Sequence, residues 1–159
     1  MSEDRVAELL AKLERGIGKT TELFQELQAE QWQEMVYENP VPWTVRDLLA
    51  HFYSSEASLL RLVQDVVAGG AGAPEGFDYN AFNAEEQKRL AGWMPSDLLE
   101  ALGVARVRTV AWVRTLQEID LDRFGRHPAL GQVTVEVMVV AIYGHQLLHM
   151  RDLMAQLDP

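Results

Sequence analysis

Hydrophobic residues recur at helical spacing in four long segments of the chain. In the first segment, from about residue 3 to 30, the apolar positions recur at roughly helical spacing: Val6, Leu9, Leu10, Leu13, Ile17, Phe24 and Leu27. This spacing predicts an amphipathic helix, although Gly16 and Gly18 weaken it near the middle. The prolines of the following NPVPW segment end regular structure.

Two further segments begin with helix-capping residues. Thr44 is placed as an N-cap, with Asp47 at the third helical position, and predicts a helix from about 44 to 68. Thr134 is placed in the same way before a helix from about 134 to 157. No strand-like run is longer than the apolar patch 133–140, and there the cap and the helical continuation favour a helix.

A long connection separates the helix at 44–68 from the next one. GGAGAPEG breaks the chain after residue 68, and residues 69 to 95 contain one short helical candidate, NAFNAEEQKRL. Pro95 and Ser96 then begin another long helix, which we expect to end at about residue 118. With 159 residues, of which 48% are hydrophobic, the chain is predicted to form a single all-α domain spanning 1–159.

Charge and composition narrow the classes of partner. Twenty-four acidic against 14 basic residues give a net charge of −10, which repels the phosphate backbone, so we expect no nucleic-acid partner. No apolar run approaches the roughly 18 residues of a membrane span, and MSEDRVAELL carries acids where a signal peptide is basic; we expect a cytoplasmic protein without a membrane partner. With no cysteine in the chain, any thiol used in a reaction must come from outside.

Three histidines occupy apolar positions of predicted helices. His145 and His149 in HQLLH lie four residues apart on one helix face, about 6 Å from each other. His51 likewise replaces an apolar residue in the helix at 44–68. An unpaired buried polar group costs about 1–3 kcal/mol, and one shared metal ion would remove this cost for all three rings. The alternative is that each ring is a hydrogen-bonded core residue.

The depth of these histidines constrains the topology. His51 lies about 10 Å inside the start of its helix, and His149 lies about 12 Å inside the end of its own. They are level only if the helices at 44–68 and 134–157 are antiparallel. A simple up-down-up-down bundle would make them parallel, whereas the long connection allows an up-down-down-up four-helix bundle with a crossover between helices two and three.

Other polar residues have weaker functional interpretations. Asn83, and less clearly Asn80, are candidates to orient a substrate from the crossover, although a turn or capping role is the commoner one for Asn. Arg106 is a candidate carboxylate clamp, and a solvated Arg is an equal alternative. Asp47 is a candidate hydrogen-bond partner of the His51 ring, but capping already explains it.

His127 and Gln146 limit what the histidine-bearing segments can do. His127 belongs to the predicted turn HPALGQV and to no helical line, which predicts a surface position. HQLLH differs from the zinc-protease signature HExxH, because Gln146 cannot act as the general base that Glu supplies there. Peptide hydrolysis is therefore disfavoured.

Four segments resemble the DinB-like superfamily of proposed metalloenzymes: PWTVRDLLAHFYSSEASLL, DYNAFN, HPALGQVT and IYGHQLLHMRDL. Within it, the chain is similar to members related to the N-terminal domain of mycothiol-dependent maleylpyruvate isomerase. The resemblance implies a four-helix bundle with a crossover, a divalent metal held by His51, His145 and His149, and a homodimer. In some members an acid replaces the His at the position of His145.

The resemblance and the open coordination left by three ligands together suggest a reaction. Catalytic metal sites keep a position free, where the metal lowers the pKa of a thiol or water. We expect a divalent metal ion, with zinc first and nickel, iron or manganese as alternatives, and a low-molecular-weight thiol cosubstrate. The leading hypothesis is a thiol-dependent transferase or isomerase acting on a small electrophile. Alternatives are a metal-dependent hydrolase and a non-catalytic, stress-associated metal- or ligand-binding bundle.

Overall fold

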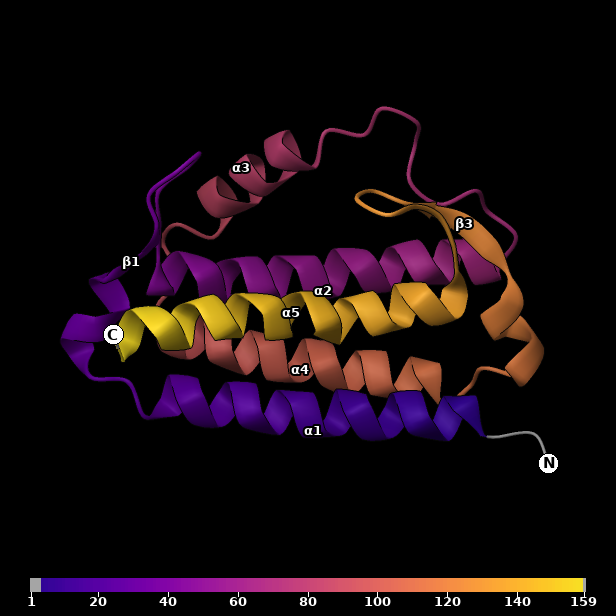
Figure 1. The fold of residues 1–159 in the computed structure, drawn as a ribbon, viewed down its shortest axis with the longest axis horizontal. Helices are drawn as coiled ribbons and strands as arrows, with labels where there is room; N and C mark the ends of the chain where they lie inside the picture. The colour runs from indigo at the N-terminus through magenta and orange to yellow at the C-terminus, as the bar shows by residue number, and fades with distance from the viewer. Residues whose placement is uncertain (1–3, 159) are drawn as a thin grey trace.

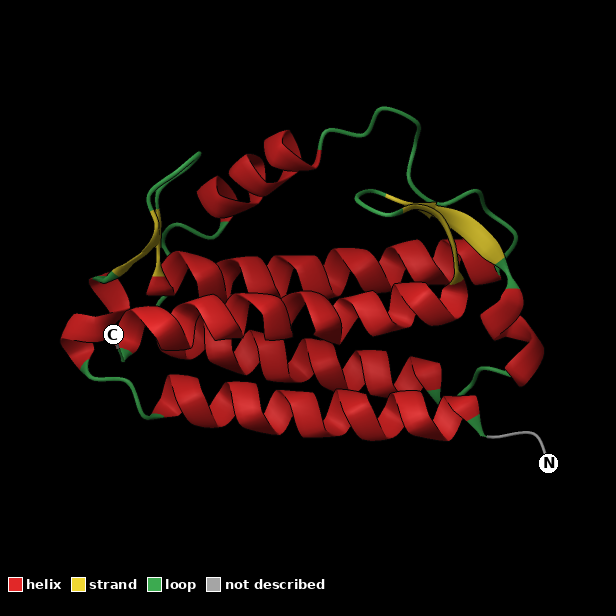
Figure 2. Cartoon of the chain, viewed as in Figure 1, coloured by secondary structure: helices red, strands yellow, loops and turns green. Residues whose placement is uncertain are grey.

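Five α-helices and two short hairpins make up residues 4–158, the residues that the computed structural model describes (Figures 1 and 2). The long helices are α1 (Arg5–Gln25), α2 (Val45–Val67), α4 (Pro95–Val113) and α5 (Val135–Leu157). The crossover contains α3 (Tyr79–Arg89), as the sequence predicts. Residue 3, the expected start of the first helix, lies outside the described residues. None of the described helices is long and apolar enough to cross a membrane.

The four long helices have the up-down-down-up order. In Figure 1, α1 and α5 run towards the end of the bundle where the C-terminus lies, and α2 and α4 run away from it. The crossover carries the chain back along the bundle, so that α2 and α4 are parallel and α5 is antiparallel to α2. Because α2 packs against both α4 and α5, the predicted crossover topology is confirmed.

Both predicted N-caps are present. The Thr44 hydroxyl accepts a hydrogen bond from the Asp47 N–H at 3.2 Å, and the Asp47 carboxylate accepts one from the Thr44 N–H at 3.0 Å. At α5, the Thr134 hydroxyl accepts from the Val137 N–H at 3.3 Å. These bonds satisfy N–H groups that a helix start leaves without partners, and they set where α2 and α5 begin relative to their histidines.

Two helices end earlier than predicted. α1 ends at Gln25 rather than near residue 30, and α4 ends at Val113 rather than near 118; a 3₁₀ turn follows each, at Ala29–Gln33 and Glu118–Asp122. In both places a side chain within the turn accepts the backbone N–H of the residue that precedes the turn. The Gln28 N–H donates to the Gln31 amide oxygen at 2.7 Å, and the Gln117 N–H donates to the Asp120 carboxylate at 2.9 Å. Such local bonds compete with continuation of the helix.

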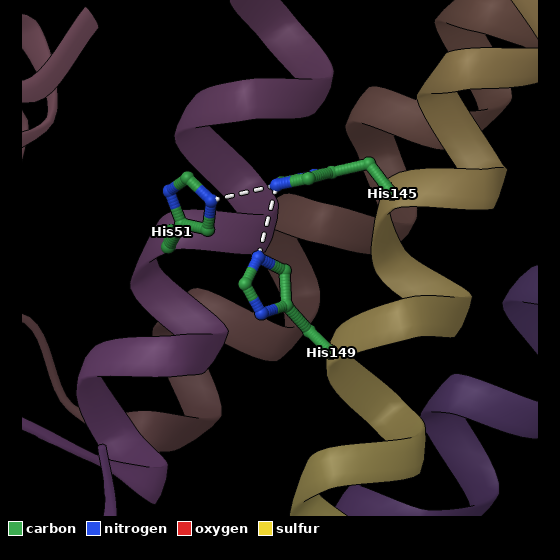
Figure 3. Close-up of side chains that lie close together, drawn as sticks. All are labelled: His51, His145 and His149. Atoms are coloured by element: carbon green, nitrogen blue, oxygen red, sulfur yellow. Dashed lines mark hydrogen bonds between the residues drawn. The ribbon is translucent and has the colours of Figure 1, made fainter.

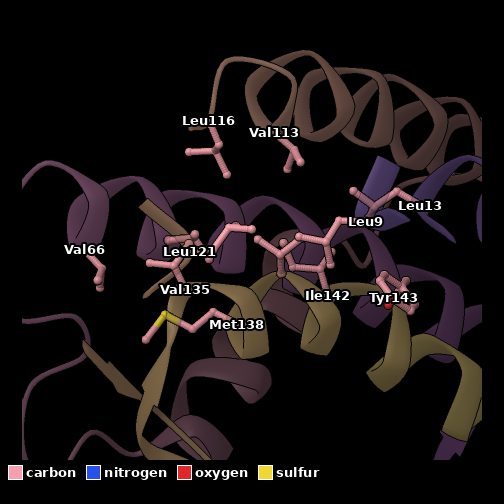
Figure 4. Close-up of a cluster of buried hydrophobic side chains, with 12 residues drawn as sticks. Leu9, Leu13, Val66, Val113, Leu116, Leu121, Val135, Met138, Ile142 and Tyr143 are labelled. Carbon is pink, nitrogen blue, oxygen red and sulfur yellow. The ribbon is translucent and has the colours of Figure 1, made fainter. Parts of the chain in front are cut away.

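Two hydrophobic clusters fill the bundle, one towards each end. Figure 4 shows the first, which includes Leu13 of α1, Val113 of α4 and Ile142 of α5. The second gathers residues from the opposite end of the same helices, including Phe24 and Met150. Apart from His51, the buried polar residues of α2, α4 and α5 fall between the two clusters along each helix, so a polar layer crosses the middle of the bundle.

An ion pair buried in this layer joins all four long helices. The Arg106 guanidinium donates to both oxygens of the Glu56 carboxylate, at 2.7 and 2.9 Å, and to the Leu13 carbonyl at 2.7 Å. Gln146 and Thr109 each donate a further hydrogen bond to Glu56, at 2.8 and 2.9 Å. Glu56 is fully buried and Arg106 is 2% exposed, so every charge in the layer is satisfied by a neighbouring helix.

The two antiparallel hairpins stand at opposite ends of the bundle (Figure 1). β1 (Met35–Tyr37) pairs with β2 (Trp43–Thr44) where α2 begins, and β3 (Phe124–His127) pairs with β4 (Gly131–Thr134) just before α5. β3 packs against both α2 and α5. Gly125 makes this contact possible, because a Cβ at that position would overlap the Val66 side chain.

Candidate metal centre

Side chains of three histidines converge between α2 and α5 (Figure 3). His51 projects from the second turn of α2, and His145 and His149 project from neighbouring turns of α5. The Nε2 atom of His145 lies 3.0 Å from Nε2 of His51 and 3.0 Å from Nε2 of His149. One ligand atom from each of the three rings lies within 4.8 Å of the others. The antiparallel arrangement of α2 and α5 thus places the three rings at the same level.

Burial keeps these rings neutral. Loss of solvation, and then the proximity of the other two rings, holds the pKa of His51 well below its usual value. Loss of solvation, and then the proximity of His149 and His127, lowers the pKa of His145 to about 4. For His149, burial lowers the pKa while the Asp152 carboxylate opposes that shift. A neutral imidazole has one nitrogen with a lone pair, which is the form that binds a metal ion.

A tyrosine and a carboxylate orient His149. The Tyr37 hydroxyl donates its proton to the Asp152 carboxylate, at 2.5 Å. Its oxygen lies 2.7 Å from Nδ1 of His149 and has no second proton to donate, so it accepts the Nδ1–H of that ring. The lone pair of His149 is therefore on Nε2, directed at the other two rings. Such outer contacts are typical of metal-binding histidines.

Hydrogen bonds alone do not satisfy the three-histidine cluster. A ring nitrogen carries either one proton or one lone pair, yet Nε2 of His145 faces two other nitrogens at the same distance. A metal ion bound by the Nε2 atoms would satisfy these three nitrogens and place the ring protons of His51 and His145 on Nδ1, where neither has a hydrogen-bond partner within residues 4–158. Two nitrogens bound tetrahedrally at about 2.0–2.1 Å from zinc lie about 3.3 Å apart. A small outward movement of the rings would meet that geometry.

The other predicted site residues lie away from the cluster or have other partners. Arg106 and Glu56 pair with each other in the buried layer, and Asp47 caps α2. Asn83 is half-buried on α3 and Asn80 is exposed. None of the hydrogen bonds in the described part of the chain joins either asparagine to the three histidines. The histidines therefore come together without the other four candidates, Asp47, Asn80, Asn83 and Arg106.

His127 is buried, whereas the sequence predicts a surface position. Its side chain is 8% exposed, and Nδ1 accepts hydrogen bonds from the Ala129 and Leu130 N–H groups at 3.1 and 3.2 Å. The ring turns back over its own backbone to cap the tight turn between β3 and β4. A residue outside every helical line is therefore not necessarily at the surface.

Sequence reasoning missed three residues around the cluster: Tyr37 and Trp43, which contact its rings, and Asp152, which binds the Tyr37 hydroxyl. Asp152 lies three residues after His149 on the same helix, a spacing at which side chains meet, so this signal was present. Tyr37 comes from β1, far away in sequence, and nothing local points to it. The Trp43 ring packs on the His51 ring with centroids 4.7 Å apart, a contact that the β1–β2 hairpin creates.

A groove of about 640 Å³ lies elsewhere, between α2 and α4. Its lining includes Tyr53, Ala57, Leu60 and Gln64 of α2, which lie on the side of that helix opposite His51. None of its lining residues is a histidine. We therefore locate the candidate chemistry at the three-histidine cluster and not in this groove.

Comparison with known proteins gives the same fold. The model of the DinB superfamily matches residues 12–153. YfiT from Bacillus subtilis, described as a probable metal-dependent hydrolase with an unusual four-helix bundle topology, is 20% identical with a TM-score of 0.73; the match covers 99% of this chain and 90% of YfiT. No curated protein sequence matches the chain.

Two further solved structures have this fold and quite different descriptions. The mycothiol-dependent maleylpyruvate isomerase is 18% identical with a TM-score of 0.76, and the match covers 93% of this chain and 60% of the isomerase. The colibactin self-resistance protein ClbS, in complex with double-stranded DNA, is 14% identical with a TM-score of 0.72, covering 96% and 95% of the two chains. At these identities the likeness shows the fold alone.

The ClbS complex overturns one prediction from composition. Exclusion of nucleic acid on the basis of net charge is wrong, because a protein with this fold is solved with double-stranded DNA. Net charge is a sum over the whole molecule, whereas phosphate contacts depend on the basic side chains and backbone N–H groups at one place on the surface. A net charge of −10 is therefore compatible with such a surface.

Proposed function

This chain belongs to the DinB superfamily, and from that premise we propose that it is a metalloprotein whose single domain holds one divalent ion through His51, His145 and His149. One observation carries the proposal: three neutral imidazoles from two antiparallel helices bring their Nε2 atoms together, 3.0 Å apart in both contacts made by His145. The donor set is all imidazole, which suits zinc first and accepts nickel or iron.

The chain's own residues prepare this site. Tyr37 and Asp152 hold His149 with its Nε2 lone pair facing the centre. Trp43 packs on the His51 ring and restricts its rotation. Because such supporting contacts exist before a ligand binds, little ordering is needed when the ion enters.

Three protein ligands leave at least one coordination position for an exogenous group, and a metal there lowers the pKa of a thiol or water. We propose that the reaction is transfer of a low-molecular-weight thiol to a small electrophile, or isomerisation assisted by that thiol. The absence of cysteine means that the chain supplies no thiol of its own. The fold neighbour whose name includes mycothiol supports this class of reaction.

Metal-dependent hydrolysis is the second candidate. The description of YfiT as a probable metal-dependent hydrolase favours it. The match to this chain covers 90% of YfiT but only 60% of the isomerase. Both reactions would use the same three histidines and the same open position. They differ in whether an external thiol is required.

The first experiment measures metal content. Protein purified without a histidine tag and repleted with zinc, nickel, manganese or iron should hold about one equivalent per chain. His51→Ala and His149→Ala should hold much less, because two imidazoles bind a divalent ion weakly. A wild-type protein that still holds well under one equivalent of every metal would contradict the proposal.

The second experiment identifies the reaction. The metal-loaded protein is presented with glutathione, mycothiol or bacillithiol together with a panel of small electrophiles, and separately with activated esters and amides without thiol. Turnover only with thiol supports transfer or isomerisation, and turnover without thiol supports hydrolysis. A metal-dependent rise in melting temperature with no turnover in either arm would indicate a non-catalytic binding bundle.

A further inference from the structure

His127 carries a buried hydrogen-bond donor without a partner. Its Nδ1 accepts two backbone N–H groups, so Nδ1 has no proton and the proton of the neutral ring is on Nε2. Burial lowers the pKa of His127, which favours that neutral form. Within residues 4–158, no group accepts the Nε2–H. Because buried donors are nearly always paired, this one points to an acceptor from outside the chain.

The position of His127 places this donor near the three-histidine cluster. β3, which ends at His127, packs on α2 and α5, the two helices that carry the cluster. The ring is within electrostatic reach of His145, since a charge on His127 would lower the pKa of that residue. His127 does not belong to the group of ligand atoms within 4.8 Å of one another, so its place is beside the cluster and outside the ligand set.

The capping role of His127 explains only half of the ring. Only Nδ1 accepts the Ala129 and Leu130 N–H groups. An Asn or Asp side chain accepts such backbone N–H groups in many turns. A histidine adds a second nitrogen on the far side of the ring. That nitrogen is the one left without a partner.

We propose that the Nε2–H of His127 donates a hydrogen bond to an acceptor oxygen of the molecule that occupies the open coordination position of the three-histidine centre. The inference rests on the proposed metal site. His127 is thus a binding residue that selects ligands having a metal-binding atom at one end and an oxygen acceptor at the other. Three neutral imidazoles do not neutralise a divalent ion, so an anionic oxygen, such as a carboxylate, suits the site best.

His127→Asn separates the two nitrogens of the ring. The amide oxygen of Asn can take the place of Nδ1 and accept the Ala129 and Leu130 N–H groups. The amide NH₂ then lies at the position of Cδ2 and does not extend as far as Nε2, so the donor at that position is lost. His127→Ala removes both functions. We expect His127→Ala to lower the melting temperature and His127→Asn to keep it close to that of the wild type.

The binding test uses cobalt(II)-loaded protein and paired thiols, with the thiolate-to-cobalt absorption as readout. The probes 3-mercaptopropionate and 4-mercaptobutyrate carry a carboxylate, and propanethiol and butanethiol do not. The wild type should bind at least one carboxylate thiol tighter than its matched alkanethiol by about tenfold or more, the lower end of what one hydrogen bond to a charged group contributes. His127→Asn should lose this preference and bind the alkanethiols as the wild type does.

Failure of the inference differs from failure of the metal site. A wild type without a carboxylate preference, or a His127→Asn variant that keeps it while both hold about one equivalent of cobalt, would overturn the role of His127 alone. A wild type that holds no cobalt overturns the metal site and this role with it. Nitrogen NMR of the ring gives a readout without metal: we expect the Nε2–H tautomer, and an Nδ1–H signal would contradict the inference.

Discussion

The protonation of individual ring nitrogens decides what each histidine can do. His149 is directed inward because Tyr37 accepts its Nδ1–H, and His127 keeps its proton on Nε2 because two backbone N–H groups occupy Nδ1. His51 and His145 have no partner on Nδ1 within the described residues. The chain therefore specifies the orientation of one ligand ring by hydrogen bonding and of the other two by packing.

Removal of the Tyr37 hydroxyl should weaken metal binding. In Tyr37→Phe, nothing accepts the His149 Nδ1–H, so neither the tautomer nor the orientation of the His149 ring is fixed by a hydrogen bond. We expect the affinity for zinc to fall about 10- to 100-fold, the usual effect of losing such an outer contact, measured by competition with a chromogenic chelator. Tyr79→Phe, at an exposed tyrosine of α3, is the matched control and should bind as the wild type does. Equal affinities in all three proteins would contradict this role of Tyr37.

The metal-free protein should lose stability as the pH falls. The pKa of His145 is about 4 in the folded chain and 6.5 when exposed, so between these values the unfolded chain binds more protons. The stability contributed by the neutral ring is complete above pH 6.5 and decreases below it, by about 1.4 kcal/mol per pH unit at most. Urea unfolding between pH 7 and 5 measures this slope. His145→Phe should show a shallower slope, and equal slopes in both proteins would refute the assignment.

Spacing and depth together predicted that the three histidines meet, because an i, i+4 pair and a third ring at matching depth are visible in the sequence. Tyr37 could not be predicted, since it reaches His149 through a three-residue strand of a separate hairpin. His127 was misplaced for a related reason: helical periodicity carries no information about a ring that caps its own turn.

At the scale of helices, the buried ion pair sets how α2, α4 and α5 lie against one another. Arg106→Met would leave the Glu56 carboxylate buried without a counter-charge. We expect a loss of about 3–5 kcal/mol in the free energy of unfolding, measured by chemical denaturation, with much of it recovered in Glu56→Gln/Arg106→Met. The exposed pair of Glu85 and Lys88 is the control, and its neutralisation should change stability little. A comparable loss there would mean that burial is not the cause.

Helix starts were better predicted than helix ends. Thr44 and Thr134 carry their capping chemistry in the residues that follow, and both caps are present. The 3₁₀ turns that follow α1 and α4 are capped by the Gln31 and Asp120 side chains, which accept the backbone N–H groups of Gln28 and Gln117. Glutamine is a common helix-forming residue, so its presence there did not signal an end.

At the scale of the whole molecule, the ion would connect two antiparallel helices that are distant in sequence. A ligand that binds only the folded state stabilises it by about 2.7 kcal/mol at 100 times its dissociation constant. The melting temperature should therefore rise with free zinc concentration and fall again when a chelator is added. His51→Ala should show no such rise, because α2 then contributes no ligand. A rise of the same size in that variant would place the ion elsewhere.

The topology was predictable because it had to satisfy one condition: the histidines of α2 and α5 meet only if these helices are antiparallel. The hairpins were not predictable, because strands of two to four residues have no recognisable alternation. The nucleic-acid prediction failed because net charge does not describe how charge is distributed over a surface.

X-ray absorption of the zinc-loaded protein tests the three-histidine centre most directly. The extended fine structure should fit three imidazole nitrogens at about 2.0–2.1 Å from zinc, with the remaining position filled by a ligand from solution. In His149→Ala the number of imidazoles should fall to two or the zinc should be lost. A wild-type spectrum with fewer than three imidazoles, or with an all-oxygen shell, would contradict the account.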